Sequence, residues 1–250
     1  MKKVILAAAV LTAAWLSGCS DDVVCPDIEP VEATLFVSAS LTQSIDGRTE
    51  TSFAEVVCTG DPLPSTLIAY INGRSLSDVG PAQDPGLRAT FEDNVVLWEP
   101  GTACSLGVTT DFGYATSVVA VPAHAAAAVP LESALGETLT ISWNDADGAD
   151  YYRVTARLVS ASRARDGHRD YIDLESNTRE LSVAFGPADL TFAGHLSGVV
   201  ESVTGPFPEG GSEGNVSGDG WGFFSARYSE SDSYFQTTIY DPLDRMRPSK

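Results

Sequence analysis

Apolar and polar residues alternate in short runs along most of the chain, and no segment sustains the 3.6-residue period of an amphipathic helix. Every second residue is apolar over residues 33–39, and again over residues 139–143 and 152–158. Clusters of Gly, Pro, Asn and Asp separate these runs at intervals typical of β-sandwiches. The pattern therefore predicts an all-β chain.

The first residues break this pattern. Lys2 and Lys3 precede an apolar run, residues 4–16, that is too short to span a membrane and leads through small residues into Cys19. The order Leu-Ser-Gly-Cys at residues 16–19 resembles a bacterial lipoprotein signal. The resemblance implies lipidation of the Cys19 thiol, removal of residues 1–18 and attachment to a membrane of the cell envelope. The alternative is an ordinary secretory signal that contains a cysteine.

Serine follows the cysteine in this signal, where aspartate would favour retention at the inner membrane. In a Gram-negative cell the resemblance therefore implies the outer membrane. The chain is also strongly acidic, with 34 Asp and Glu against 15 Lys and Arg and a net charge of −19. Nucleic acid is excluded as a partner, because binding a phosphate backbone requires a basic face.

The first group of predicted strands spans residues 32–122. Cys58 precedes the turn Gly-Asp-Pro-Leu-Pro at residues 60–64, a predicted strand over residues 67–71 ends at Asn72-Gly73, and Cys104 follows later. These features resemble an immunoglobulin-like domain, although the tryptophan that the family carries on its third strand is missing. The resemblance implies a β-sandwich with a disulfide between Cys58 and Cys104.

The second group begins with residues 139–143, a turn over residues 144–150, and a strand from Tyr152 onward. It resembles the second and third strands of a fibronectin type III domain, which implies that Trp143 is buried against Tyr152 or Val154. Further strands are expected at residues 181–185, 196–203, 222–228 and 234–240. The predicted organisation is a signal peptide (1–18), a tether (19–31), an immunoglobulin-like sandwich (32–122), a linker (123–130), a fibronectin type III-like sandwich (131–240) and a C-terminal tail (241–250).

Cys25 lies in the predicted tether, outside both sandwiches. We expect it to be free or to pair between molecules. A bond from Cys25 to Cys58 or to Cys104 is the alternative, and it would tie the tether to the first domain.

The sequence contains no convincing catalytic or metal-binding arrangement, so we expect no enzyme activity, no metal and no cofactor. The sequence around Ser212 fits the motif G-x-S-x-G of a nucleophile elbow, but it lacks the following helix that exposes the serine in that motif. The three histidines, His124, His168 and His195, are far apart in sequence. The acidic turn at residues 144–150 lacks the ligand positions of an EF-hand.

The candidate binding loop is residues 160–170, which concentrates positive charge in an acidic chain. Its basic residues are Arg163, Arg165, His168 and Arg169. They are suited to carboxylates or phosphates of a partner. The alternative is a solvated loop whose arginines pair with local aspartates.

These observations favour a lipid-anchored binding module that recognises a protein or glycan through loops of tandem β-sandwiches. One alternative is a structural or accessory subunit of an envelope complex without its own ligand. An enzyme is the least supported class, because no acid–base pair, triad or metal cluster emerges.

Overall fold

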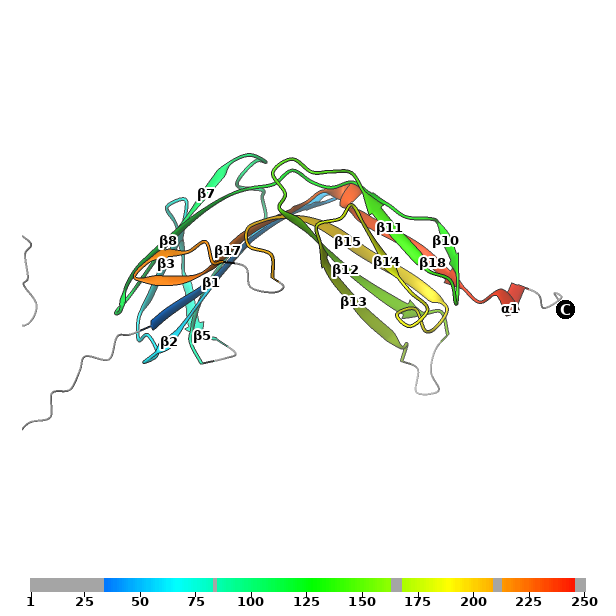
Figure 1. Ribbon diagram of the computed structural model, residues 1–250, viewed down its shortest axis with the longest axis horizontal. Coiled ribbons are helices and arrows are strands. Elements are labelled where there is room, and N and C mark those ends of the chain that lie inside the picture. The colour runs from blue at the N-terminus through cyan, green and yellow to red at the C-terminus, as the bar shows by residue number, and fades with distance from the viewer. Residues whose placement is uncertain (1–33, 83–84, 163–167, 209–212, 246–250) are drawn as a thin grey trace, which may run out of the picture. The chain divides into compact units, whose positions relative to one another are not determined.

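The computed structural model describes residues 34–82, 85–162, 168–208 and 213–245, and these residues confirm the expected all-β class (Figure 1). The predicted signal peptide and tether lie outside the described residues. Within the described ranges, no helix is long and apolar enough to cross a membrane.

The strands fall into two groups along the chain. Those before residue 121 are β1 (Thr34–Asp46), β2 (Thr49–Asp61), β3 (Leu67–Ile71), β4 (Arg74–Leu76), β5 (Asp78–Pro81), β6 (Leu87–Asp93), β7 (Ala103–Thr110) and β8 (Gly113–Ala120). Those after it are β9 (Ala127–Ala128), β10 (Glu132–Ala134), β11 (Leu139–Trp143), β12 (Tyr151–Ser160), β13 (Tyr171–Thr178), β14 (Ser182–Phe185), β15 (Gly194–Thr204), β16 (Ser217–Gly218), β17 (Gly220–Ser229) and β18 (Tyr234–Tyr240). A 3-10 turn, η1 (Ser231–Ser233), separates β17 from β18, and a short helix, α1 (Pro242–Arg245), follows β18.

These strands form three sheets among the described residues. The largest follows the order β10-β18-β15-β17-β1-β2-β6-β5, with β12 paired to β15 and β13 paired to β12. A five-stranded sheet has the order β16-β8-β7-β3-β4, and a three-stranded sheet has the order β14-β11-β9.

Two hydrophobic cores lie between the sheets, because each strand buries alternate side chains. On β1, for example, Leu35, Val37 and Leu41 are buried. The first core takes side chains from β1, β2, β6 and β17 on one side and from β3, β7 and β8 on the other. The second core takes them from β12, β15 and β18 and from β11 and β14.

Strands β11 and β12 of the second core bury the side chains that the alternation predicts. Leu139, Ile141 and Trp143 are buried on β11, and Trp143 is 5% exposed. Its ring centroid lies 5.4 Å from that of Tyr152 on β12. The expected burial of Trp143 against Tyr152 is therefore confirmed.

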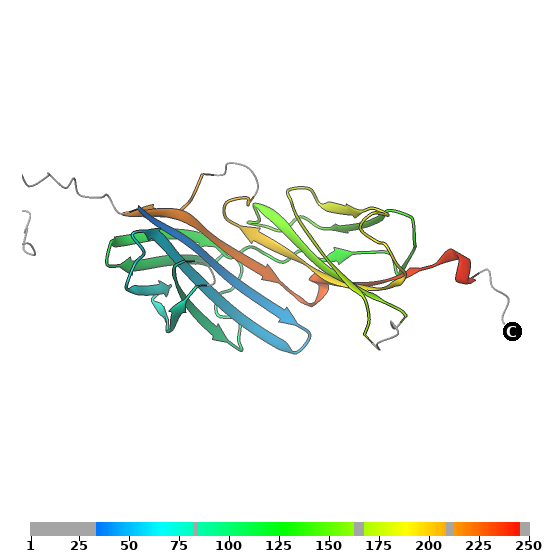
Figure 2. The same ribbon diagram turned by 90° about the horizontal axis from the view of Figure 1, so that it is seen from below.

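Strand β17 differs from the sequence interpretation, which assigns residues 222–228 to the second sandwich. Instead, β17 runs parallel to β1 for ten residue pairs, from Leu35 opposite Gly220 to Ser44 opposite Ser229 (Figure 2). Its Phe224 is fully buried in the first core. Alternation reveals that such a strand has one buried face, but it does not reveal which core receives that face.

A glycine permits the close approach of these two strands. Gly222 has a φ of +148°, and a Cβ at this position would overlap the backbone carbonyl of Val37 on β1. A larger residue would therefore separate the strands at this point.

The chain then returns to the second core along one edge of β15. Residues 202–204 of β15 pair with β17, and residues 194–199 pair with β18. The segment predicted as one domain, residues 131–240, therefore gives a strand to the first core. One hydrogen-bonded sheet continues past both cores.

Replacing Trp143 with Ala should lower the free energy of unfolding by about 3–5 kcal/mol, the usual cost of deleting a large buried side chain. Trp143→Phe should cost clearly less, because the ring contact survives and the buried indole N–H has no hydrogen-bond partner among the described residues. Chemical denaturation of both variants measures the difference. A loss under about 1 kcal/mol for Trp143→Ala would contradict the observed packing.

Candidate binding site

A polar surface covers the outer face of β12, β13, β15 and β18. Alternation on β12 turns Val154 and Leu158 into the core and places Arg157 on the outer face. Asp173 of β13 is opposite Arg157 in the strand register, and Ser197 of β15 is opposite it on the other side. Charged side chains of adjacent strands are thereby brought within reach of each other.

Arg157 contacts two residues of β13 on this face. Its Nε and Nη2 donate to the two carboxylate oxygens of Asp173 at 2.6 and 2.9 Å, a bidentate arrangement. Its guanidinium carbon also lies 4.7 Å from the centroid of the Tyr171 ring. The hydrogen bond from Arg157 holds the pKa of Asp173 below its ordinary value, so this carboxylate stays ionised at neutral pH.

Arg153 forms a second pair of contacts on the same face. Its Nε donates to Glu175 at 2.8 Å, and its Nη1 donates to Glu201 at 3.1 Å. The hydrogen bond from Arg153 lowers the pKa of Glu175. The two arginines thus link β12 to β13 and to β15.

A groove of about 680 Å³ lies on this surface. The residues that line it come from the end of β1 and from β12, β13, β15 and β18: Asp46, Thr155, Ala156, Arg157, Asp173, Leu174, Glu175, Ser197, Gly198, Val199, Tyr234, Phe235 and Gln236. Three carboxylates and one guanidinium belong to this set, so its side chains offer mainly acceptors and negative charge. The exposed Tyr234 adds an aromatic side chain.

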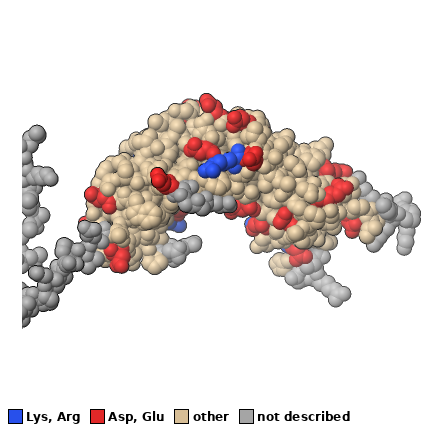
Figure 3. All heavy atoms as spheres, viewed as in Figure 1, with Lys and Arg blue, Asp and Glu red and all other residues tan. Residues whose placement is uncertain are grey.

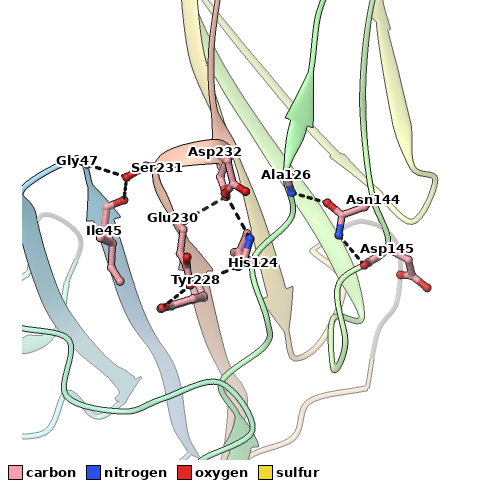
Figure 4. Close-up of polar contacts among 11 residues, drawn as sticks. Ile45, Gly47, His124, Ala126, Asn144, Asp145, Tyr228, Glu230, Ser231 and Asp232 are labelled. Carbon is pink, nitrogen blue, oxygen red and sulfur yellow. Dashed lines mark hydrogen bonds and ion pairs between the residues drawn. The ribbon is translucent and has the colours of Figure 1, made fainter.

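The β1–β2 turn is held next to the groove by contacts with η1 (Figure 4). Ser231 Oγ accepts a hydrogen bond from Gly47 N at 2.9 Å and donates to Ile45 O at 3.4 Å. Asp46, which lies between these two residues, therefore reaches the groove. The 3-10 turn η1 leads directly into Tyr234, the first residue of β18.

His124 contacts two carboxylates in the segment between β17 and β18, which contains η1. Its Nδ1 lies 3.3 Å from Glu230 Oε1, and its Nε2 lies 3.3 Å from Asp232 Oδ1, as Figure 4 shows. Tyr228 also donates to Glu230 at 3.1 Å. These partly exposed contacts position the segment between β17 and β18, although each contributes little stability.

In the part of the chain that the structure describes, no group of three His, Cys, Asp or Glu side chains could hold a metal ion. The acidic turn before β12 uses its carboxylates structurally. Asp145 accepts from Tyr152 Oη at 2.8 Å, and Asp150 accepts from Gly205 N at 2.8 Å.

The predicted binding loop is only partly described. Arg163 and Arg165 lie outside the described residues, as do Cys19, Cys25 and Ser212. His168 and Arg169 are exposed just before β13, at the end of the β12–β13 hairpin. The groove lies along the strands instead of in this loop.

Cys58 and Cys104 are both fully buried in the first core, but the expected disulfide between them is not present. Both are free thiols. Facing the same core is necessary for a bridge but does not fix the distance between two Cα atoms. Burial raises the pKa of Cys58 to about 12 and that of Cys104 to about 11.

The sequence interpretation missed the groove. The alternation that identified the buried residues of β12 also places Arg153 and Arg157 on one outer face, so a charged face was detectable. The pairing with Asp173 and Glu175 depends on strand register, which alternation does not give. The sequence matches no family model and no curated protein, so the candidate site rests on its geometry.

The thiols provide a pH-dependent prediction. Native protein at pH 8 should not react with iodoacetamide at Cys58 or Cys104, because both thiols are buried and protonated. In denaturant without reductant both should be alkylated, which peptide mapping measures at each cysteine. Alkylation only after adding a reductant would instead indicate a disulfide. Since the folded pKa values exceed the ordinary 9.0, the thiols' contribution to stability should fall as the pH rises above 9 toward 11–12.

Proposed function

We propose that this chain is a lipid-anchored binding module of the bacterial cell envelope, with an immunoglobulin-like and a fibronectin type III-like sandwich. Its function is to recognise a protein or glycan. The Leu-Ser-Gly-Cys order at residues 16–19 supports the anchor, and the two cores between facing sheets support the sandwiches. In a Gram-negative cell the anchor would be in the outer membrane.

The groove on the outer sheet face is the observation that carries the binding function. Three of its charged side chains, Arg157, Asp173 and Glu175, are held in ion pairs before any ligand arrives, which reduces the entropy lost on binding. Acidic side chains also dominate the charged positions of the face drawn in Figure 3. A ligand rich in hydroxyl, amide or cationic groups would complement the carboxylates and Tyr234. We therefore place recognition in the groove, not in the loop at residues 160–170.

A substitution that fills the groove tests this function. Ser197 is exposed on β15 and faces the groove, so Ser197→Trp should block a ligand without disturbing the core. Ser75→Trp, at an exposed position on β4, is the matched control. The purified full-length protein and both variants are tested on immobilised glycans, purified peptidoglycan and a peptide panel of varied charge. We expect at least one ligand to bind the unaltered protein. Its Kd should rise at least tenfold with Ser197→Trp and should stay unchanged with Ser75→Trp.

Two results would contradict the proposal. Binding that Ser197→Trp leaves unchanged would place recognition elsewhere on the protein. No binding to any member of the three panels would favour a structural subunit without its own ligand.

A further inference from the structure

A second hollow adjoins the groove on the outer face of β15 and β18, two strands that lie side by side in Figure 1. Its volume is about 410 Å³, and Ser197 and Gln236 line both this hollow and the groove. The two hollows are therefore parts of one continuous depression along the strand pair. We call its outward-facing strand residues the β15–β18 track: His195, Ser197, Val199, Tyr234, Gln236 and Thr238.

The register of the two strands gives the track its length. Its residues form three rows across the antiparallel pair: Val199 opposite Tyr234, Ser197 opposite Gln236, and His195 opposite Thr238. Leu196 and Phe235 alternate with them and are buried in the second core. Residues 195–199 of a strand span about 14 Å. The depression therefore has room for a chain of several units.

The two ends of the track differ in charge. The groove end is lined by three carboxylates, including that of Asp46. At the other end, none of the described residues that line the second hollow is Asp, Glu, Lys or Arg. Leu131 borders this end, is 85% exposed, and accepts a backbone hydrogen bond from Thr238 N at 3.1 Å. A cationic polymer would therefore find carboxylates along only part of the depression.

Polar side chains of the track are available to a ligand. Those of Ser197, Gln236 and Thr238 form no hydrogen bond with another residue that the structure describes. Arg157 and Asp173, by contrast, already pair with each other. Hydroxyl and amide groups donate as well as accept hydrogen bonds, so they complement a ligand that carries many hydroxyl groups.

The backbone along the track favours a sugar chain over an extended peptide. Residues 194–199 of β15 pair with β12 on one side and with β18 on the other. A peptide therefore cannot add a strand to β15 here, which is the usual way for a sheet to bind an extended main chain. A sugar chain needs no such edge, because its hydroxyls bond to side chains and its apolar ring faces pack on aromatic groups such as Tyr234.

We propose that the β15–β18 track binds a linear, uncharged glycan chain that extends from Tyr234 to Leu131 and fills both hollows. This inference rests on the proposed function, for which it names the class of ligand. In the groove, sugar hydroxyls donate to carboxylates such as that of Asp46. In the second hollow, they form hydrogen bonds with Gln236 and Thr238.

The dependence of affinity on chain length tests this proposal. The purified full-length protein is titrated calorimetrically with two series of oligosaccharides, β-1,4-linked glucose and β-1,4-linked N-acetylglucosamine, each of two to six residues. Oligolysines of the same lengths are titrated in parallel. At least one sugar series should bind. Its six-residue member should have a Kd at least tenfold lower than its two-residue member, because only the longer chain reaches both hollows.

A substitution at the far end separates the two hollows. His195 is exposed and lines the second hollow but not the groove. His195→Trp should therefore raise the Kd of the six-residue sugar at least fivefold and leave that of the two-residue sugar unchanged. Ser197→Trp should weaken both. Thr140→Trp, at an exposed position on β11 in the three-stranded sheet, is the matched control and should weaken neither.

The outcomes distinguish this inference from the proposed function. Equal Kd values at every chain length, or a six-residue Kd that His195→Trp leaves unchanged, would overturn the track and confine the ligand to the groove. Binding of neither sugar series would overturn the glycan as ligand, and oligolysine binding that Ser197→Trp blocks would then favour a basic peptide. The proposed function itself fails only if Ser197→Trp weakens the binding of no ligand in the broader panels.

Discussion

The parallel pairing of β1 with β17 is the constraint on which the rest of the structure depends. Ten residue pairs join a strand that starts at residue 34 to a strand that starts at residue 220. Phe224 and Tyr228 of β17 lie in the first core, so this core is completed only by a segment far along the chain. Because β17 also pairs with β15, the same strand joins the two parts of one sheet that cover the two cores.

This connection positions the candidate site. After β17 the chain turns through η1, which holds the β1–β2 turn, and then forms β18 at one side of the groove. Asp46 from the first strand and Tyr234 from the last therefore line one surface together with β12, β13 and β15. The site depends on long-range strand pairing, and a short motif in the sequence could not have revealed it.

The positions of individual strands could be predicted from the sequence, whereas the pairing of strands far apart in the chain could not. The predicted strand over residues 139–143 coincides with β11, and that over residues 67–71 coincides with β3, because alternation and turn residues act within a few positions. Which core β17 joins depends on its register with β1 and on the close approach of these two strands at Gly222. Alternation likewise indicates that Cys58 and Cys104 face inward, whereas bond formation depends on the separation of two strands in opposite sheets.

Oxidative cross-linking tests the β1–β17 pairing most directly. Ser40 and Ser225 are opposite each other on these strands, and neither is buried in the core. Cysteines at both positions should form an intramolecular disulfide, which peptide mapping of unreduced protein identifies. Ser44 and Thr51, whose hydroxyl oxygens lie 2.7 Å apart in the β1–β2 hairpin, provide a matched pair for the same treatment. Linkage of both pairs is the expected result. Linkage of the hairpin pair without any bond between positions 40 and 225 would contradict the account.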